Sequence, residues 1–285
     1  MSTFNDFILT LSCPDRTGIV HAVSGFLLSF NGNIVDSQQF GDEETQHFFL
    51  RIHFRVAADI QEAQLRQEFT PLADKFAMHW QLHNTQTKSR VLILVSKQGH
   101  CLNDLLFRAH TGSLPVDIVG IASNHRDFEI LAKTYNIPFH YLPVTNETRE
   151  GQEAHILQLV DELKVDLVVL ARYMQILSNQ MCVSLTGKAI NIHHSFLPSF
   201  KGARPYHQAH ARGVKIIGAT AHYVTSDLDE GPIIEQAIES VDHSMTAEDL
   251  VQVGADTESL VLSRAVRHHV EHRILLNGNK TVVFS

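Results

Sequence analysis

The stretch AINIHHS at residues 189–195 starts with the apolar residues of a buried strand and ends in polar ones. Alanine and isoleucine fill its first half except at Asn191, and two histidines and a serine close it. A strand with so apolar a start belongs in a parallel sheet that is covered on both faces. Ligands bind such a sheet beyond the carboxyl ends of its strands. The stretch therefore predicts a buried parallel sheet with polar side chains at its ligand-binding edge.

Short apolar runs of the same kind recur along the second part of the chain. They lie at residues 91–96, 116–123, 139–143 and 166–171, and helical patterns separate most of them. Strands that alternate with helices predict an α/β fold with a mainly parallel open sheet and helices on both faces. Two further runs, at 216–224 and 233–240, are expected to extend the sheet, and a long helix near 246–272 closes the domain. No GxGxxG follows the first strand, so a dinucleotide site is not expected.

A polar segment at residues 84–90, NTQTKSR, has no apolar period and is interpreted as a linker. It divides the chain into a front domain at 1–83 and a back domain at 91–285. In the front domain, strands are expected at 7–12, 33–40, 47–56 and 79–83, with one helix soon after Asp15 and another at about 60–77. This βαββαβ order predicts a small α+β sandwich.

Composition excludes several classes of partner. The 285 residues carry a net charge of −8, counting histidine as neutral, which argues against a nucleic-acid partner because such a partner needs a basic patch. Cys13, Cys101 and Cys182 lie far apart, as is typical of proteins in a reducing cytoplasm. The first residues lack the basic segment of a signal peptide, and no apolar stretch approaches the roughly 20 residues of a membrane helix. We therefore expect a cytoplasmic protein without a membrane partner.

Asn191 and His193 form the first candidate for catalysis. They are two residues apart in a strand, so their side chains point to one face, and His194 is expected to point to the other. An amide and an imidazole on one face can both donate hydrogen bonds to a substrate oxygen. The alternative is a strand end whose polar groups simply meet a loop, and the pattern alone does not decide between them. For His194 by itself the structural alternative is favoured.

A second polar cluster lies in HYVTSDLDEGPII at residues 222–234. His222 falls inside a strand pattern, and Asp227, Asp229 and Glu230 fall in a turn that ends at Gly-Pro. Acids before Gly-Pro are usually turn residues that face water, and each of the three taken alone would be interpreted so. A carboxylate brought beside an imidazole is, however, a common acid–base arrangement.

The chain has 19 histidines, which are common metal ligands. His207 and His210 are three apart in an expected helix and can share a face. No HExxH motif is present and no cysteine lies near them, so we expect no metal ligands here.

The two clusters carry a family resemblance. NIHHSFLP and GATAHYVTSDLDEGPII resemble the signature of folate-dependent formyltransfer enzymes, and the resemblance covers about residues 90–275. It implies that Asn191, His193 and Asp229 surround the formyl group of 10-formyltetrahydrofolate. It further implies that the folate is the substrate and that no cofactor takes part. The stretch ARYMQIL at 171–177 resembles the family segment that lines the pterin pocket. The substrate-binding residues implied by the resemblance are Met174, Ile176, Leu177, His222 and Val224.

The front domain carries a second resemblance. Residues 13–34, CPDRTGIVHAVSGFLLSFNGNI, are similar to the opening of ACT domains, small modules that often bind amino acids and pair across a subunit interface. The resemblance implies a homo-oligomer and an effector site at Asp15, Gly18, Asn31 and Asn33, with methionine or glycine as the effector. From the residues alone, Asp15 is expected to cap a helix whose N–H groups can receive a carboxylate. A purely structural pairing module stays open as the alternative.

An ACT-like domain before a formyltransfer domain resembles the members of the family that hydrolyse 10-formyltetrahydrofolate, and the formate would serve one-carbon and purine metabolism. Relatives that formylate glycinamide ribonucleotide carry a loop of small residues after the first strand, which cradles the substrate phosphate. Here the same place reads SKQGHCLNDLL, residues 96–106, with one glycine and with Lys97 and His100 as its basic groups. Two alternatives stay open: an amine formyltransferase of the same fold, and an amino-acid sensor whose second domain only binds folate.

Overall fold

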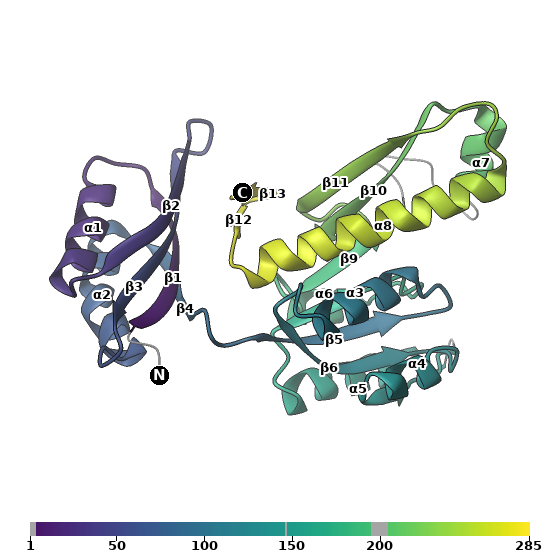
Figure 1. Ribbon diagram of the computed structural model, residues 1–285, viewed down its shortest axis with the longest axis horizontal. Coiled ribbons are helices and arrows are strands. Elements are labelled where there is room, and N and C mark those ends of the chain that lie inside the picture. The colour runs from purple at the N-terminus through teal and green to yellow at the C-terminus, as the bar shows by residue number, and fades with distance from the viewer. Residues whose placement is uncertain (1–3, 146, 195–204) are drawn as a thin grey trace. The chain divides into compact units, whose positions relative to one another are not determined.

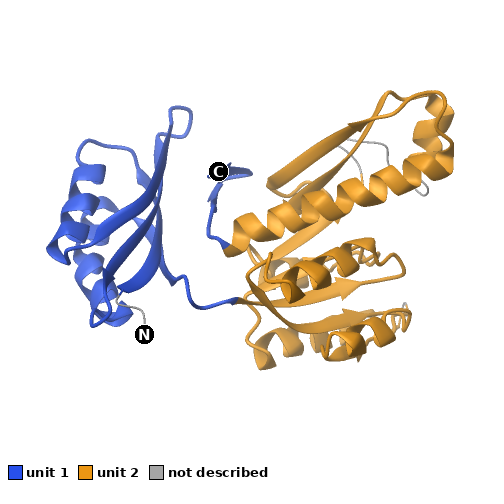
Figure 2. Ribbon diagram, in the orientation of Figure 1, with its two compact units in different colours: residues 1–88, 271–285 blue, residues 89–270 orange. Residues whose placement is uncertain are grey.

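The computed structural model describes residues 4–145, 147–194 and 205–285. The chain divides into two compact units (Figure 2). One comprises Met1–Lys88 with Glu271–Ser285, and the other comprises Ser89–Val270. The sequence predicts a back domain that runs to residue 285, whereas the last fifteen residues belong to the front unit. Residues 85–88 lie between the last strand of the front unit and the first strand of the back unit, so the predicted linker is longer than the observed connection.

The front unit is a four-stranded antiparallel sheet with two helices (Figure 1). Its elements follow the predicted βαββαβ order, which is thereby confirmed. They are β1 (Phe4–Pro14), α1 (Ile19–Ser29), β2 (Asn33–Asp42), β3 (His47–Ala57), α2 (Glu62–Phe76) and β4 (His79–Asn84). The strands lie in the order β2-β3-β1-β4, so that the first and third strands occupy the centre.

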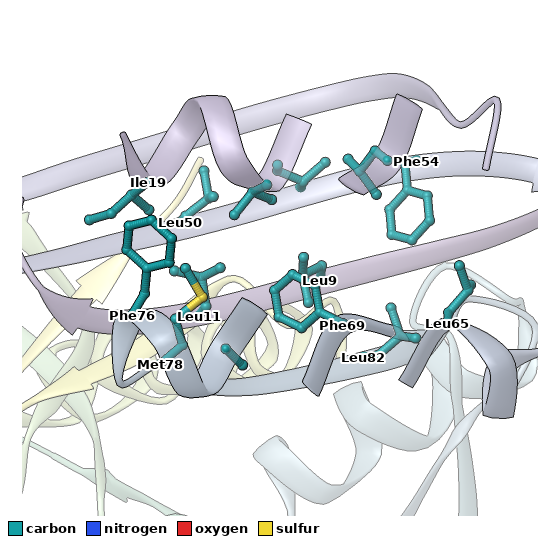
Figure 3. Packing of buried hydrophobic residues seen from close by; sticks show 14 of the residues in the cluster. Leu9, Leu11, Ile19, Leu50, Phe54, Leu65, Phe69, Phe76, Met78 and Leu82 are labelled. Atoms are coloured by element: carbon teal, nitrogen blue, oxygen red, sulfur yellow. The ribbon is translucent and has the colours of Figure 1, made fainter. Parts of the chain in front are cut away.

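The core of the front unit lies between the sheet and the two helices (Figure 3). Leu9 and Leu11 of β1 point to one face because they are two apart, and they pair with Ile52 and Leu50 of β3. On the helix side, Leu65 and Phe69 of α2 recur at helical spacing and are fully buried. Side chains two apart in the strands and four apart in the helix thus meet in one apolar layer.

Helix α1 starts later than predicted. Its first residue is Ile19, and the N-cap is Gly18 in a left-handed conformation with φ of 96°, without a side-chain cap. Asp15 therefore does not cap the helix, and that prediction is wrong. The reason is that the Asp15 N–H still donates to the Gln46 carbonyl at 2.9 Å, which continues the pairing of β1 with β3 beyond Pro14.

A short C-terminal hairpin, which the sequence pattern does not predict, completes the front unit. It consists of β12 (Ile274–Asn277) and β13 (Lys280–Val283), which pair antiparallel. The buried Arg51 side chain on β3 donates to the carbonyls of Glu271 and His272 at 3.0 and 3.1 Å, and Asn277 donates to Asp42 at 2.6 Å. These contacts explain why the segment after the long helix belongs to the front unit.

The back unit is a seven-stranded sheet in the order β11-β10-β9-β8-β5-β6-β7. Strands β5 (Ser89–Val95), β6 (Val116–Ser123), β7 (Phe139–Tyr141), β8 (Leu167–Leu170) and β9 (Ala189–His193) run parallel. Strands β10 (Ile216–Tyr223) and β11 (Ile233–Ser240) extend the sheet antiparallel. The predicted mainly parallel open sheet is confirmed. Its strand order reverses at β5, which places the topological switch point between β5 and β8.

Helices flank this sheet (Figure 1). They are α3 (His100–His110), α4 (Glu129–Thr134), α5 (Arg149–Glu162), α6 (Asn179–Ser184), α7 (Pro205–Arg212) and α8 (Ala247–Val270). Ile156 of α5 and Met181 of α6 are buried against Leu92 and Leu170 of the sheet. Helix α8 packs against β9, β10 and β11 and against α3 and α7. Among the residues described, no helix has the length and apolar character that crossing a membrane requires.

Candidate active site

A cavity of about 220 Å³ opens at the carboxyl ends of β8 and β9. This is the edge at which an open parallel sheet binds its ligands, and it lies next to the switch point. Most of the lining comes from three separate segments of the chain: residues 170 and 172–177, residues 191–194, and residues 222 and 224–229. The two motifs that the sequence singles out therefore meet in one place, although about thirty residues separate them.

Strand pairing brings the polar side chains together. Strands β9 and β10 run antiparallel with Asn191 directly opposite His222, so both side chains lie on one face of the sheet. The Asn191 amide lies 3.2 Å from Nε2 of His222. The other ring nitrogen of His222 lies 2.9 Å from the Tyr223 carbonyl, which fixes Nδ1 as a donor and leaves Nε2 to accept from Asn191 in the neutral ring.

Asp229 joins this group from the turn after β10. Its carboxylate lies 3.3 Å from Nδ1 of His193 and 3.7 Å from Nε2 of His222. Burial of the carboxylate favours its neutral form, but the hydrogen bond from His193 and the nearby His222 outweigh burial and hold the pKa of Asp229 well below its usual range. The carboxylate is therefore ionised at neutral pH. An acid before Gly-Pro, taken alone, is interpreted as facing water, but here the turn folds back onto the ends of β9 and β10 and brings Asp229 beside the two imidazoles.

The turn that carries Asp229 is sterically constrained. Asp229 itself has a left-handed conformation with φ of 59°, which is uncommon for a residue other than glycine. A Cβ atom on Gly231 would lie only 1.7 Å from the Tyr223 carbonyl oxygen. Across the turn, the Tyr223 N–H donates to the Pro232 carbonyl at 2.9 Å. Glycine is therefore required for the close approach of the two chain segments that sets the position of the carboxylate.

We expect Gly231→Ala to destabilise the back unit by about 1–3 kcal/mol, since a side chain forced into a filled space shifts the backbone. Catalytic activity at the cavity should fall with it, because the turn places Asp229. Urea unfolding measures the first effect. The control is Gly151→Ala on α5, where an added Cβ meets nothing within 4 Å and should be neutral or mildly stabilising. Equal stability of both variants would contradict the constraint.

The second side of the cavity is apolar. Met174 and Ile176 are each 60% exposed, and Leu228 on the facing turn is 61% exposed. Leu177 and Val224 line the cavity as well. Large apolar side chains left open to solvent around a cavity are suited to cover a flat aromatic ring. All five substrate-binding residues that the sequence predicts lie in the lining of this one cavity.

His194 departs from the prediction. Strand alternation predicts its side chain on the opposite face from His193, yet both rings line the cavity and stack with centroids 4.7 Å apart. Strand β9 ends at His193, so the alternation of side chains stops there. Burial and the nearby Arg172 guanidinium lower the pKa of His194 to about 4, which keeps its ring neutral.

The other basic residues that the sequence singles out lie at the surface. His207 and His210 are exposed on α7, and Lys97 is exposed after β5. In the part of the chain that is described, one group has the spacing of metal ligands, namely His100, Cys101 and Glu258. Its carboxylate lies 3.4 Å from the Arg172 guanidinium, and burial raises the pKa of the Cys101 thiol, so both features oppose a cation.

The predicted effector residues lie in the front unit, and all of them are exposed. Asp15 and Gly18 lie before α1, whereas Asn31 and Asn33 follow it. A helix of eleven residues is about 16 Å long at 1.5 Å per residue, so the two pairs lie at opposite ends of α1. Within one chain they do not converge on a molecule as small as an amino acid.

The cavity combines an amide, imidazoles and an ionised carboxylate with an apolar wall. This combination is typical of enzymes that transfer an acyl group from a substrate with an apolar ring. Residues 89–266 match the formyl transferase family, and the chain belongs to it. Over 97% of both chains it is 54% identical to formyltetrahydrofolate deformylase from Corynebacterium sp. (strain P-1). The crystal structure of formyltetrahydrofolate deformylase from Burkholderia mallei superposes with a TM-score of 0.95 at 52% identity, covering 99% of this chain and 100% of that one.

The similarity to a transferase structure extends over only part of this chain. The crystal structure of glycinamide ribonucleotide transformylase 1 from Symbiobacterium toebii superposes with a TM-score of 0.65 at 28% identity. It covers 70% of this chain and 95% of that one. Full-length similarity is thus found with the deformylases, and the particular group within the family is that of the formyltetrahydrofolate deformylases.

Proposed function

We propose that Asn191, His193 and Asp229 catalyse the hydrolysis of 10-formyltetrahydrofolate to tetrahydrofolate and formate. The observation that supports these residues is their meeting in one cavity, with Asp229 within 3.3 Å of His193. The pterin ring lies against Met174, Ile176 and Leu177 on one side and the turn after β10 on the other. This binding mode brings N10 and its formyl group next to the polar end of the cavity.

Asn191 and His193 stabilise the charge that develops on the formyl oxygen. His193 uses Nδ1 to donate to Asp229, so its Nε2, in the protonated ring, donates to the substrate. The Asn191 amide has a second N–H besides the one directed at His222. Two donors fixed before the reaction favour the tetrahedral intermediate over the planar formyl group, and this difference accelerates attack.

Asp229 orients the attacking water and moves its proton. Water oxygen forms a bond to the formyl carbon, the carbon–N10 bond breaks, and the proton lost by water replaces carbon on N10. A carboxylate with a lowered pKa is a weak base, so Asp229 passes the proton on to N10 as that bond breaks rather than retaining it. Side chains of this chain supply every proton transfer, and the proposal includes no cofactor.

The two alternatives make different products. An amine formyltransferase would need an acceptor before tetrahydrofolate appears, and a folate-binding sensor would release none. The full-length similarity to deformylases and the assembled set of Asn191, His193 and Asp229 favour hydrolysis.

The test is an incubation with 10-formyltetrahydrofolate and no acceptor. Hydrolysis predicts tetrahydrofolate and formate in equal amounts, and added glycinamide ribonucleotide neither speeds the reaction nor becomes formylated. Tetrahydrofolate that forms only in the presence of an amine would establish the transferase instead.

The front unit is proposed to be an ACT-type regulatory module in a cytoplasmic homo-oligomer. Because Gly18 and Asn31 lie at opposite ends of α1, one amino-acid site needs Asp15 and Gly18 of one subunit and the asparagines of another. Carboxylate binding at the exposed N–H groups before α1 suits the first half of such a site.

Calorimetry of the full chain with a panel of amino acids tests this module. We expect methionine or glycine to bind and to alter the hydrolysis rate, and Asn33→Ala to weaken binding without changing the rate in the absence of effector. No heat from any amino acid, together with an unchanged rate, would leave a structural pairing module.

A further inference from the structure

A polar network that the mechanism does not use lies beside the reaction centre, and its two charged members, Arg172 and Glu258, are buried. The Arg172 guanidinium, at the end of β8, donates from Nε to Gln98 at 2.7 Å and from Nη1 to Nδ1 of His194 at 2.9 Å. Its Nε also lies 3.4 Å from the Glu258 carboxylate. Arg172 is 8% exposed and still belongs to the cavity lining, so it forms part of the wall next to the stacked histidines.

Glu258 on α8 anchors this network. It is 1% exposed, and its two carboxylate oxygens accept from His100 and from the Tyr206 hydroxyl, each at 2.7 Å. Burial favours the neutral carboxyl, but His100, Arg172 and Tyr206 together hold the pKa of Glu258 below its usual range. Removing either Arg172 or Glu258 would leave the other as a buried charge without compensation, so each of the two requires its partner.

The backbone at Arg172 is the second observation. Its φ is 62°, in the left-handed region that favours glycine and is uncommon for a long side chain. A strained residue of this kind persists where the surrounding structure requires it, and such positions cluster at functional sites. Glycine would suit the backbone better, so the arginine side chain itself is what the site needs.

In the proposed binding mode, the network lies on the side of the reaction centre that the folate does not occupy. The apolar side of the cavity, at Met174 and Leu228, is suited to the pterin. Beyond His193 the wall continues with His194 and Arg172. Gln98 and His100, which follow β5, are tied to Arg172 and Glu258, so the segment after β5 uses these side chains within the protein rather than for a second substrate.

We propose that Arg172, held by Gln98 and Glu258 against His194, is a specificity-determining residue that closes this flank to an amine acceptor and makes the site hydrolytic. The inference rests on the proposed function. Water is small enough to reach the formyl carbon past the closed wall, whereas an amine with substituents needs the volume that the guanidinium and its partners occupy. Even one methylene that a pocket cannot accommodate changes discrimination between substrates by about 10–200-fold.

Opening the wall should change the products. With an amine, the nitrogen forms a bond to the formyl carbon, the carbon–N10 bond breaks, and the proton lost by the amine goes to N10. The test variant is Arg172→Gly combined with Glu258→Gln, which removes the guanidinium, suits the left-handed backbone and leaves no unpaired buried charge. The matched control is Arg126→Gly with Glu129→Gln, an arginine–glutamate pair at 2.8 Å that is exposed on the surface of the same unit.

Each protein is incubated with 10-formyltetrahydrofolate and glycinamide as a small primary amine, and the uncatalysed reaction is subtracted. We expect the ratio of N-formylglycinamide to formate to rise at least about tenfold in the test variant and to stay at the wild-type value in the control. An unchanged ratio in the folded variant would overturn the proposal. So would loss of both reactions with folate still bound, because the network would then support the catalytic residues instead.

Arg172→Lys provides a second readout if the double variant does not fold. It keeps a cation near Glu258 but lacks the guanidinium fork, so the ratio should shift in the same direction by a smaller factor. The same ratio as in the wild type would again overturn the proposal. Absence of acceptor-free hydrolysis in the wild-type protein is a separate result, and it would refute the proposed function itself.

Discussion

Asp229→Asn is expected to lower the rate of hydrolysis by at least about 10²-fold, since proton transfer by a positioned side chain contributes roughly 10²–10⁴-fold. Asparagine keeps the size of aspartate and one carbonyl oxygen, so the turn and the folate site should persist. What disappears is the ionised carboxylate that lies 3.3 Å from Nδ1 of His193 and relays the proton from water to N10.

The matched control for Asp229→Asn is Glu230→Gln, the adjacent acid in the same turn, which is exposed and does not line the cavity. Its rate should equal that of the wild type. Substrate binding, followed by quenching of protein fluorescence, should be similar in both variants. A folded Asp229→Asn protein with near-wild-type turnover would remove Asp229 from the mechanism.

Asn191→Ala is expected to lower kcat by about 10²–10³-fold with little change in KM, because one donor to the developing oxyanion is lost and the ground state does not depend on it. The substitution also removes the hydrogen-bond partner of His222 at 3.2 Å. Steady-state kinetics separate the two parameters.

Asn103→Ala, on the exposed surface of α3, is the control for the change of residue type and should leave both parameters unaltered. If Asn191→Ala instead raised KM while kcat stayed constant, Asn191 would be a binding residue and not a donor to the transition state.

Much of the architecture follows from local patterns. Leu9 and Leu11 alternate in a strand, Leu65 and Phe69 recur in a helix, and both sets are buried as their periods predict. The parallel sheet follows in the same way from apolar runs such as 166–171. The placement of Asn191 and His193 on one strand face needs only the two-residue period of a strand, and so the sequence alone predicts it.

Other features depend on contacts between distant segments, which no local pattern encodes. Asp229 comes within reach of His193 through a turn whose shape depends on Gly231 and the Tyr223 carbonyl. Glu258 lies in the middle of a long helix, where a charged residue is usually interpreted as exposed, and Arg172 stands inside a segment interpreted through its apolar residues. Position alone identifies neither of them.

The same limit applies to the chain end. The hairpin at 274–283 has short strands, and its place in the front unit depends on Arg51, which lies more than two hundred residues earlier. A charged residue in the middle of β3 is the one signal in the sequence, because a buried arginine requires partners such as the Glu271 and His272 carbonyls.

The most direct measurement is the fate of oxygen when 10-formyltetrahydrofolate is turned over in ¹⁸O-labelled water without any acceptor. Attack by water at the formyl carbon predicts one labelled oxygen in each formate and one tetrahydrofolate for each formate released. The rate of label incorporation should fall in Asp229→Asn in parallel with turnover. Formate without label, or tetrahydrofolate that appears only after an amine is added, would contradict hydrolysis at this site.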